Sequence, residues 1–312
     1  MYYIGNMCDS ADSINYRELI FDPSIFSGKT FNGINSGERR CRFCRRLLPE
    51  THFQKEAHAI SVSLGNKKFF CADECDECNK KFGHALENDV TLFFQVYLSL
   101  YQVPKRNGKE RQVSGKNFDM KMSGENPFST NLPLLRFHLY DWKDDKAKTD
   151  EVIKMMANLD LSNKTFIPQN VYKTICKYAL SLMPHSVTEH YQKTIQWIQD
   201  NSFALSLPKL KIASFDREGN EPIMYLLLRQ TISKGYPLCV AYLCVANIHI
   251  VYVLPFCDES EGTEKDNVLI DTFWEQFTNS SSLFCGQKYE DFDLSSSNRI
   301  GFKIELDLKM EA

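Results

Sequence analysis

The chain has 312 residues, which suggests two domains rather than one, and 43% of them are hydrophobic, enough to bury a core. The formal net charge of −3 excludes a chain that binds nucleic acid through overall positive charge, so any such surface has to be a local patch. No basic segment followed by an apolar one opens the sequence, so a secretory signal peptide is not expected. The odd number of cysteines, eleven, then indicates a cytoplasmic protein whose cysteine pairs bind metal.

The first half of the chain divides into three predicted segments. Residues 1–35 are expected to form an N-terminal extension, and residues 36–102 a compact cysteine-rich domain. Within it, apolar residues recur at helical spacing over 84–102, which predicts a helix there. Residues 103–131 are rich in Lys, Arg and turn-forming residues, which predicts a basic linker or a hairpin.

The second half, residues 132–312, is predicted to be a separate α+β domain. Helices are expected over 167–183 and 186–201, and strands over 209–215, 237–245, 247–256 and 299–310. Helices followed by strands, without a repeated βαβ order, indicate the α+β class. The apolar run 237–256 is nearly long enough for a membrane helix. Its content of Val, Tyr and Ile favours two buried strands around a turn near Asn247, and no contact with a membrane is expected.

Two cysteine pairs have the spacing of a metal site. Cys41 and Cys44 form one C-x-x-C pair, and Cys75 and Cys78 form another. Two such pairs supply four thiolates, which suits a tetrahedral and closed structural zinc site. Cys71 lies close by and is expected to be a buried thiol, with an exchange for Cys75 as the less favoured alternative.

The segment between the cysteine pairs resembles the HNH nucleases, which have the ββα-metal fold. The matching stretches are "CRFC" at 41–44, "EAHAISVSLGNK" at 56–67 and "ECDECNKKFG" at 74–83. They are similar to a bacterial subgroup that carries a four-cysteine zinc site. The resemblance implies an α+β protein with an N-terminal zinc-stapled nuclease module. Its expected activity is the metal-dependent hydrolysis of phosphodiester bonds in DNA, with RNA not excluded, and its expected catalytic cofactor is Mg²⁺ or another divalent cation.

The resemblance also assigns roles to individual residues. His58 corresponds to the general base, a role that suits an imidazole near neutral pH. Asn79, directly after the second cysteine pair, corresponds to a ligand of the catalytic cation. Glu87 is a third candidate, because it falls two helical turns after Asn79 and on nearly the same face.

The sequence departs from the family pattern at two positions. Many relatives have an acidic residue just before the histidine, where this chain has Ala57, and Glu56 is the nearest acid that shares a strand face with His58. The orienting asparagine of the family is missing before the second cysteine pair. Asn66 is the nearest candidate, with Asp73 or Glu74 as alternatives. A zinc-stapled module that binds nucleic acid or protein without cutting is therefore the competing hypothesis.

Basic residues lie on both sides of the expected site. The candidates for contact with phosphates are Arg39, Arg40, Arg42, Arg45, Arg46, Lys105 and Arg106. No sequence-reading element is recognisable. By analogy with small bacterial proteins that place such a module before an unrelated domain, a role in defence against phage is expected. Residues 132–312 are then expected to bind a regulatory protein or a small-molecule trigger, or to determine specificity.

Overall fold

The computed structural model describes residues 16–19, 39–123, 134–140, 152–215, 221–229, 236–258 and 288–311, and residues 271, 273–275, 277 and 278. The predicted N-terminal extension lies outside these residues except for 16–19, and the predicted linker is described as far as residue 123. The structure contains helices and antiparallel sheets, so the α+β prediction is confirmed. The division into separate domains stays a prediction.

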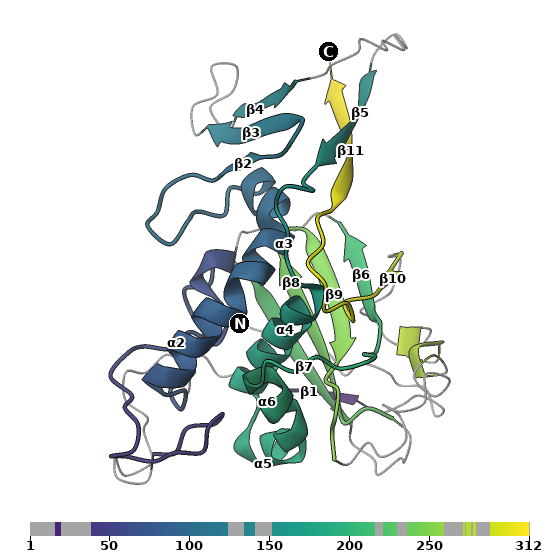
Figure 1. The fold of residues 1–312 in the computed structure, drawn as a ribbon. Helices are drawn as coiled ribbons and strands as arrows, with labels where there is room; N and C mark the ends of the chain where they lie inside the picture. Colours follow the sequence, from purple (N-terminus) through teal and green to yellow (C-terminus); the bar gives the residue numbers. More distant parts are fainter. Residues whose placement is uncertain are drawn as a thin grey trace.

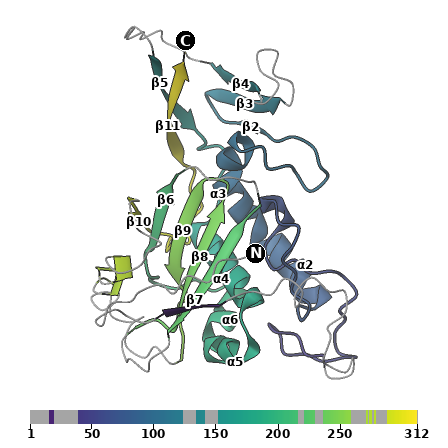
Figure 2. The ribbon, with the colours of Figure 1, turned by 180° about the vertical axis from the view of Figure 1, so that it is seen from behind.

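The main sheet has six antiparallel strands in the order β1-β7-β8-β9-β6-β10 (Figures 1 and 2). Their bounds are Tyr16–Leu19 (β1), Leu210–Ser214 (β6), Ile223–Arg229 (β7), Cys239–Val245 (β8), Ile248–Val253 (β9) and Glu290–Phe292 (β10). The strands expected at 209–215, 237–245 and 247–256 are therefore confirmed as β6, β8 and β9. The sequence analysis did not identify β1, β7 or β10.

Strands β8 and β9 form a hairpin at the centre of this sheet. Ala246 and Asn247 make the turn, and Ala246 adopts a left-handed conformation with φ 53°. Every residue of both strands is buried, which is typical of strands whose two faces are covered. The apolar run 237–256 is thus a hairpin, as predicted, and none of the described helices has the length and apolar character needed to cross a bilayer.

One face of the sheet is covered by helices from the middle of the chain. These are α4 (Pro168–Leu182), α5 (His185–Thr188), the 3-10 helix η3 (Glu189–Tyr191) and α6 (Gln192–Gln199). Figure 2 shows the strands in front of α4 and α6. Helix α4 starts at a proline, whose fixed φ suits a first turn, and ends before Met183, which Pro184 restricts to an extended conformation. The single helix predicted over 186–201 is split into three.

All fifteen residues of α4 are buried, because α4 lies between the sheet and the cysteine-rich segment. On the sheet side, Tyr172 donates to the Val253 carbonyl at 2.9 Å and Tyr252 donates to the Ile175 carbonyl at 2.7 Å. On the other side α4 packs on α3. A single hydrophobic cluster therefore extends from Cys41 and Phe43 through α3 and α4 to the sheet.

The cysteine-rich segment contains little regular structure apart from helices. It has the 3-10 helix η2 (Val62–Leu64) and the helices α2 (Asp76–Ala85) and α3 (Glu87–Leu100). The helix expected over 84–102 corresponds to α3. The expectation that Asn79 and Glu87 share one helix is wrong, because Leu86 leaves the helical conformation with φ −122° and ends α2.

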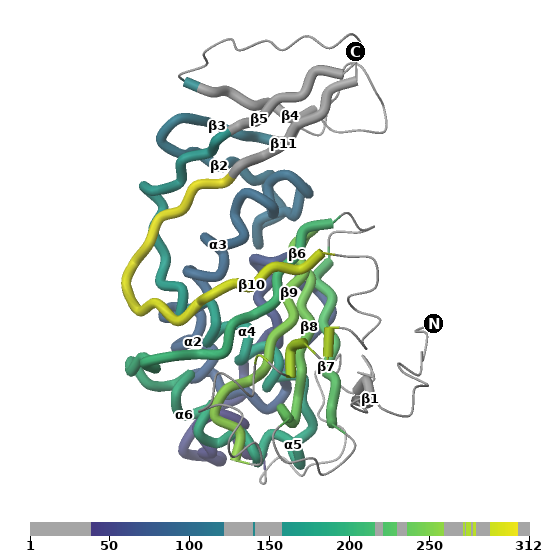
Figure 3. Tube along the Cα trace, turned by 90° about the vertical axis from the view of Figure 1, so that its right-hand side faces the viewer, coloured from purple at the N-terminus to yellow at the C-terminus, as the bar shows by residue number. Residues whose placement is uncertain are grey.

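Two small sheets lie beyond the far end of α3, away from the main sheet (Figure 1), and Figure 3 shows β2 and β3 there from the side. One contains β2 (Gln112–Ser114), β3 (Phe118–Ser123) and β4 (Leu134–Leu139). The other pairs β5 (Val152–Asp160) with β11 (Lys303–Glu311), which confirms the strand predicted over 299–310. Residues 112–123 thus form a hairpin.

Candidate functional site

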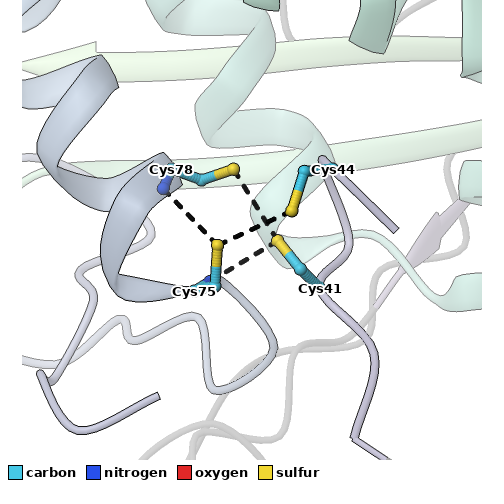
Figure 4. A group of neighbouring side chains, drawn as sticks. All are labelled: Cys41, Cys44, Cys75 and Cys78. Carbon is cyan, nitrogen blue, oxygen red and sulfur yellow. Dashed lines mark hydrogen bonds between the residues drawn. The ribbon is translucent and has the colours of Figure 1, made fainter. Parts of the chain in front are cut away.

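The four cysteines of the two pairs converge on one point (Figure 4). Cys41 and Cys44 lie in a tight loop in which the Cys41 N–H donates to the Arg46 carbonyl and its carbonyl accepts from the Arg45 N–H. Cys75 caps the N-terminus of α2, and Cys78 lies in its first turn. The sulfur atoms are 3.8 Å apart for Cys41 and Cys78, 3.7 Å for Cys44 and Cys75, and all lie within 4.8 Å of one another.

This spacing is compatible with zinc. Four sulfurs at about 2.3 Å from a tetrahedral zinc ion lie about 3.8 Å apart. The contact between the Cys41 and Cys78 sulfurs lowers the pKa of Cys41 to about 5 and raises the pKa of Cys78. Thiolates this close repel one another, and a bound dication removes that repulsion. With four protein ligands the site has no open position, so it fits a structural role.

Cys71 is separate from this cluster. Its thiol is buried and donates to an Asp73 carboxylate oxygen at 3.2 Å, and burial raises its pKa well above the ordinary value. It is a packed thiol, as the sequence favours.

His58 lies on a very short antiparallel ladder between the two cysteine pairs. It bridges to Phe70, and two backbone hydrogen bonds flank this bridge. The Ala59 N–H donates to the Phe69 carbonyl at 3.0 Å, and the Cys71 N–H donates to the Ala57 carbonyl at 2.8 Å. The imidazole is half-buried and packs on the Phe70 ring with 4.6 Å between centroids. Its Nδ1 is buried and has no hydrogen-bond partner among the described residues.

The surroundings favour the neutral form of His58. Burial lowers the pKa of the imidazole, and the charges of Arg106 and Lys177 lower it further. The carboxylates of Glu56 and Glu87 oppose this effect and raise the pKa. A neutral imidazole can accept a proton, which is the property that a general base requires.

Asn66 closes the loop that follows His58. Its side chain is buried, and its amide nitrogen donates to the carbonyls of Ile60 at 2.6 Å and Phe69 at 2.8 Å. Its amide oxygen accepts from the N–H groups of Lys68 and Phe69. Because these bonds use both ends of the amide, Asn66 acts on the loop rather than on a reacting atom. This placement suits an orienting asparagine.

The three expected cation ligands are not gathered into a closed cluster. Glu87 begins α3, and its Oε2 accepts from the Ser61 hydroxyl at 2.7 Å. Asn79 is half-buried in the first turns of α2, and Glu56 is exposed. Within the described residues, the four cysteines are the only group of three or more His, Cys, Asp or Glu side chains with ligand atoms within 4.8 Å of one another. Glu56 and Glu87 are near enough to His58 for their charges to raise the pKa of its imidazole.

Most of the expected phosphate-contacting residues lie on the surface. Arg40, Arg45, Arg46, Lys105 and Arg106 are exposed, and Arg39 is half-buried against the ring of Phe53. Arg42 is different, and the expectation that it contacts phosphate does not agree with its position. It is 4% exposed, forms an ion pair with Asp73 at 2.9 Å, and donates to the carbonyls of Leu180 and Met183 at the end of α4.

The sequence analysis missed the residues of α4 that support this segment. Lys177 is 1% exposed and donates to the His58 carbonyl at 2.9 Å, and it pairs with Glu74 at 3.0 Å. The available signal was weak: two lysines, Lys173 and Lys177, stand four residues apart in a helix with apolar residues on several sides. Nothing local indicates that one of them reaches a residue 119 positions earlier.

Comparison with known proteins gives one match. Residues 41–92 match the family model described as HNH endonuclease, a span that includes both cysteine pairs, His58, Asn66, Asn79 and Glu87. No curated protein matches the chain, and no solved structure does.

Proposed function

We propose that the chain is a metal-dependent endonuclease that hydrolyses phosphodiester bonds of DNA with the module formed by residues 41–92. One observation carries the proposal. His58 lies beside two clustered cysteine pairs in an HNH-like segment, and its buried Nδ1 has no partner among the described residues. An unpaired buried polar atom is unfavourable, so a water or another ligand is expected to reach it.

His58 acts as the general base in this proposal. Its neutral imidazole takes a proton from a water molecule, and the water oxygen forms a bond to phosphorus. The bond between phosphorus and the leaving oxygen breaks in the same displacement, and that oxygen gains a proton from solvent. Asn66 acts indirectly, because its four hydrogen bonds fix the loop between the two sides of the short ladder.

Glu56, Asn79 and Glu87 are the residues that would hold Mg²⁺ or another divalent cation. Carboxylate and amide oxygens are the ligands that Mg²⁺ prefers, and substrate phosphates and water usually complete its coordination. Oxygen donors that do not form a closed cluster among the described residues agree with this mode of binding. When bound, the cation supplies stabilisation for the negative charge that develops on the phosphate and the leaving oxygen.

Five exposed basic residues supply contacts to the phosphate backbone in this proposal: Arg40, Arg45, Arg46, Lys105 and Arg106. Arg106 is the most informative of them, because its charge reaches His58 and lowers the pKa of the imidazole. Basic residues of this kind provide affinity without reading sequence. Arg39 contributes less, because its guanidinium lies over Phe53 and donates to the Ala72 carbonyl.

A cytoplasmic role in defence against phage, with the second half of the chain as a sensor, completes the proposal. What supports a small-molecule trigger is an open surface depression of about 600 Å³ beside α6, whose walls include Trp197, Phe203 and Phe256. Aromatic walls with a few polar groups are typical of ligand sites. The alternative trigger is a regulatory protein that binds to the same region.

The competing function is a zinc-stapled module that binds nucleic acid or protein without cutting. Two observations favour it: Ala57 stands where relatives have an acid, and the nearest acid, Glu56, is exposed. The lack of a closed cluster of Glu56, His58 and Glu87 among the described residues does not separate the two functions by itself.

The test is cleavage of a supercoiled plasmid and of a matched RNA by the full chain with Mg²⁺ or Mn²⁺. Cleavage that needs the cation and is lost in His58→Ala supports the endonuclease, and the preferred substrate separates DNA from RNA. His190→Ala, in the second half of the chain, is the matched histidine control and should cut normally. Tight binding with no cleavage under any condition, including added phage lysate as a source of trigger, would support the binding module instead.

A further inference from the structure

Helix α4 carries two buried lysines with different partners. Lys173 and Lys177 are each 1% exposed and lie one helical turn apart. Lys173 donates to the carbonyls of Asp200 and Ser202, which belong to the same half of the chain. Lys177 points to the cysteine-rich segment, where it meets the His58 carbonyl and the Glu74 carboxylate. A buried ammonium group is unfavourable unless it is paired and hydrogen-bonded, so each lysine requires an explanation.

The bond from Lys177 to His58 satisfies a group that the local ladder leaves open. In an antiparallel pair, alternate residues point their N–H and C=O groups away from the partner strand. The Ala57 carbonyl and the Ala59 N–H form hydrogen bonds with the strand of Phe70. The carbonyl of His58, which lies between them, therefore points away from that strand. Lys177 donates to that carbonyl at 2.9 Å. Without this bond a partly buried carbonyl would lose its partner.

The ladder that carries His58 is too short to fix the residue by itself. A single bridge and two flanking bonds hold it to the strand of Phe70. Asn66 supports it from the loop side through its bonds to Ile60 and Phe69. Lys177 supports it from the helix side, so the backbone of His58 is held from two directions.

A second contact holds the same helix against the same segment. Arg42 pairs with Asp73 and donates to the carbonyls at the end of α4, one turn beyond Lys177. Asp73 and Glu74 are neighbours in sequence, so two adjacent carboxylates meet Arg42 and Lys177. The position of α4 is thereby coupled to the backbone of the segment that contains His58.

We infer that Lys177 is a positioning residue for His58, and that helix α4 is the element through which the second half of the chain sets the geometry of the nuclease centre. This inference rests on the proposed nuclease function. Lys177 does not touch the substrate. It acts through the His58 backbone, where a displacement of about 1 Å can lower a rate by about 100-fold.

The test compares three variants of the full chain: Lys177→Met, the double variant Lys177→Met with Glu74→Gln, and Lys173→Met. Breaking one partner of a buried pair leaves an uncompensated charge, so Lys177→Met can fail to fold. The double variant removes both charges and keeps a similar volume. Lys173→Met is the matched control, because it removes a buried ammonium group and two carbonyl bonds from the same helix without affecting His58.

Two readouts are measured on zinc-loaded protein: kcat and KM for cleavage of a DNA duplex with Mn²⁺, and amide hydrogen exchange at Ala59 and Cys71. For the double variant we expect kcat to fall about 10- to 100-fold with KM nearly unchanged, and exchange at both amides to accelerate. Lys173→Met should alter neither readout, even if its melting temperature falls.

A double variant with wild-type kcat and wild-type exchange would overturn the inference and leave Lys177 as a counter-charge for Glu74. Accelerated exchange without loss of kcat would overturn it as well, because the ladder would then move without consequence. If wild-type protein does not cut DNA, the proposed function fails, and exchange at Ala59 still shows whether Lys177 holds the His58 ladder.

Discussion

Different interactions stabilise residues 39–85 of the cysteine-rich segment and the main sheet. In the sheet, β8 and β9 are paired along their whole length, and every residue in them is buried. In the cysteine-rich segment, the ladder at His58 is one bridge long. Three buried charged or polar residues of the segment, Arg42, Glu74 and Asn66, make ion pairs or hydrogen bonds there. We therefore expect apolar burial to be sufficient for the sheet, and the segment to depend in addition on bound zinc, on ion pairs and on α4.

Removal of zinc should have the largest effect and should separate the two regions. Binding of structural zinc by small domains contributes about 10–16 kcal/mol of apparent free energy. A chelator, or Cys75→Ser, should therefore unfold residues 39–85 first and abolish cleavage, while amides of β8 and β9 keep more of their protection. Hydrogen exchange with parallel measurement of zinc content checks this. Simultaneous loss of protection in both regions would show that they unfold as one unit.

Breaking the Arg42–Asp73 pair should have the next largest effect. Arg42→Met leaves the buried Asp73 carboxylate with His185, at 2.8 Å, as its remaining ion-pair partner. Removal of one partner of a buried pair reduces the free energy of unfolding by about 3–5 kcal/mol. The exposed Arg45 provides the control, since Arg45→Met should alter stability by less than about 0.5 kcal/mol but weaken DNA binding. Urea unfolding and a salt-dependent binding assay distinguish the two. Equal stability of the two variants would contradict the structural role of Arg42.

A cavity in the sheet should destabilise the chain without affecting the metal site. Leu243 is fully buried in β8, and Leu243→Ala is expected to lower the free energy of unfolding by about 2–5 kcal/mol. At a temperature where the variant is folded, its zinc content and its rate of cleavage should equal those of the wild type. Loss of zinc in this variant would mean that the sheet, and not only α4, supports the cysteine-rich segment.

The smallest expected effect concerns the pH dependence of stability. It originates from a lysine on α4 and does not involve the cysteine-rich segment. Burial lowers the pKa of Lys173 to about 8, below the value of about 10.4 expected in the unfolded chain. Between these values the unfolded state binds more protons, so stability rises with pH, and below about 8 the penalty of burying the charge is fully present. The melting temperature of wild type relative to Lys173→Met should therefore rise between about pH 8 and pH 10. If the difference in melting temperature between wild type and Lys173→Met stays constant from about pH 8 to pH 10, Lys173 does not titrate in this range.

The sequence predicted the regions whose structure is encoded locally. The apolar run at 237–256 specified the hairpin of β8 and β9, because a central strand covered on both faces needs such a run. Pro168 marked the start of α4, and the two C-x-x-C pairs identified the cysteine cluster. His58 and Asn66 both fall within the span that matches the family model, residues 41–92.

The sequence could not predict features that depend on contacts between distant residues. Arg42 has the same local surroundings as Arg45, and only the end of α4 and Asp73 determine that it is buried. Leu86 breaks the helix between Asn79 and Glu87, although the apolar spacing continues through it. Lys177 reaches His58 from 119 residues away, and no local pattern indicates such a contact.

The central claim is that the protein binds two metal ions of different kinds. Four cysteines hold a zinc ion, and a second divalent cation binds beside His58 with coordination positions left for substrate and water. Anomalous scattering from crystals grown with Mn²⁺ and a short DNA duplex tests this directly. The account predicts a manganese peak bounded by His58 and by side chains from among Glu56, Asn79 and Glu87, separate from the zinc peak. Manganese found only at scattered surface positions, with the His58 imidazole packed away from the DNA, would contradict it.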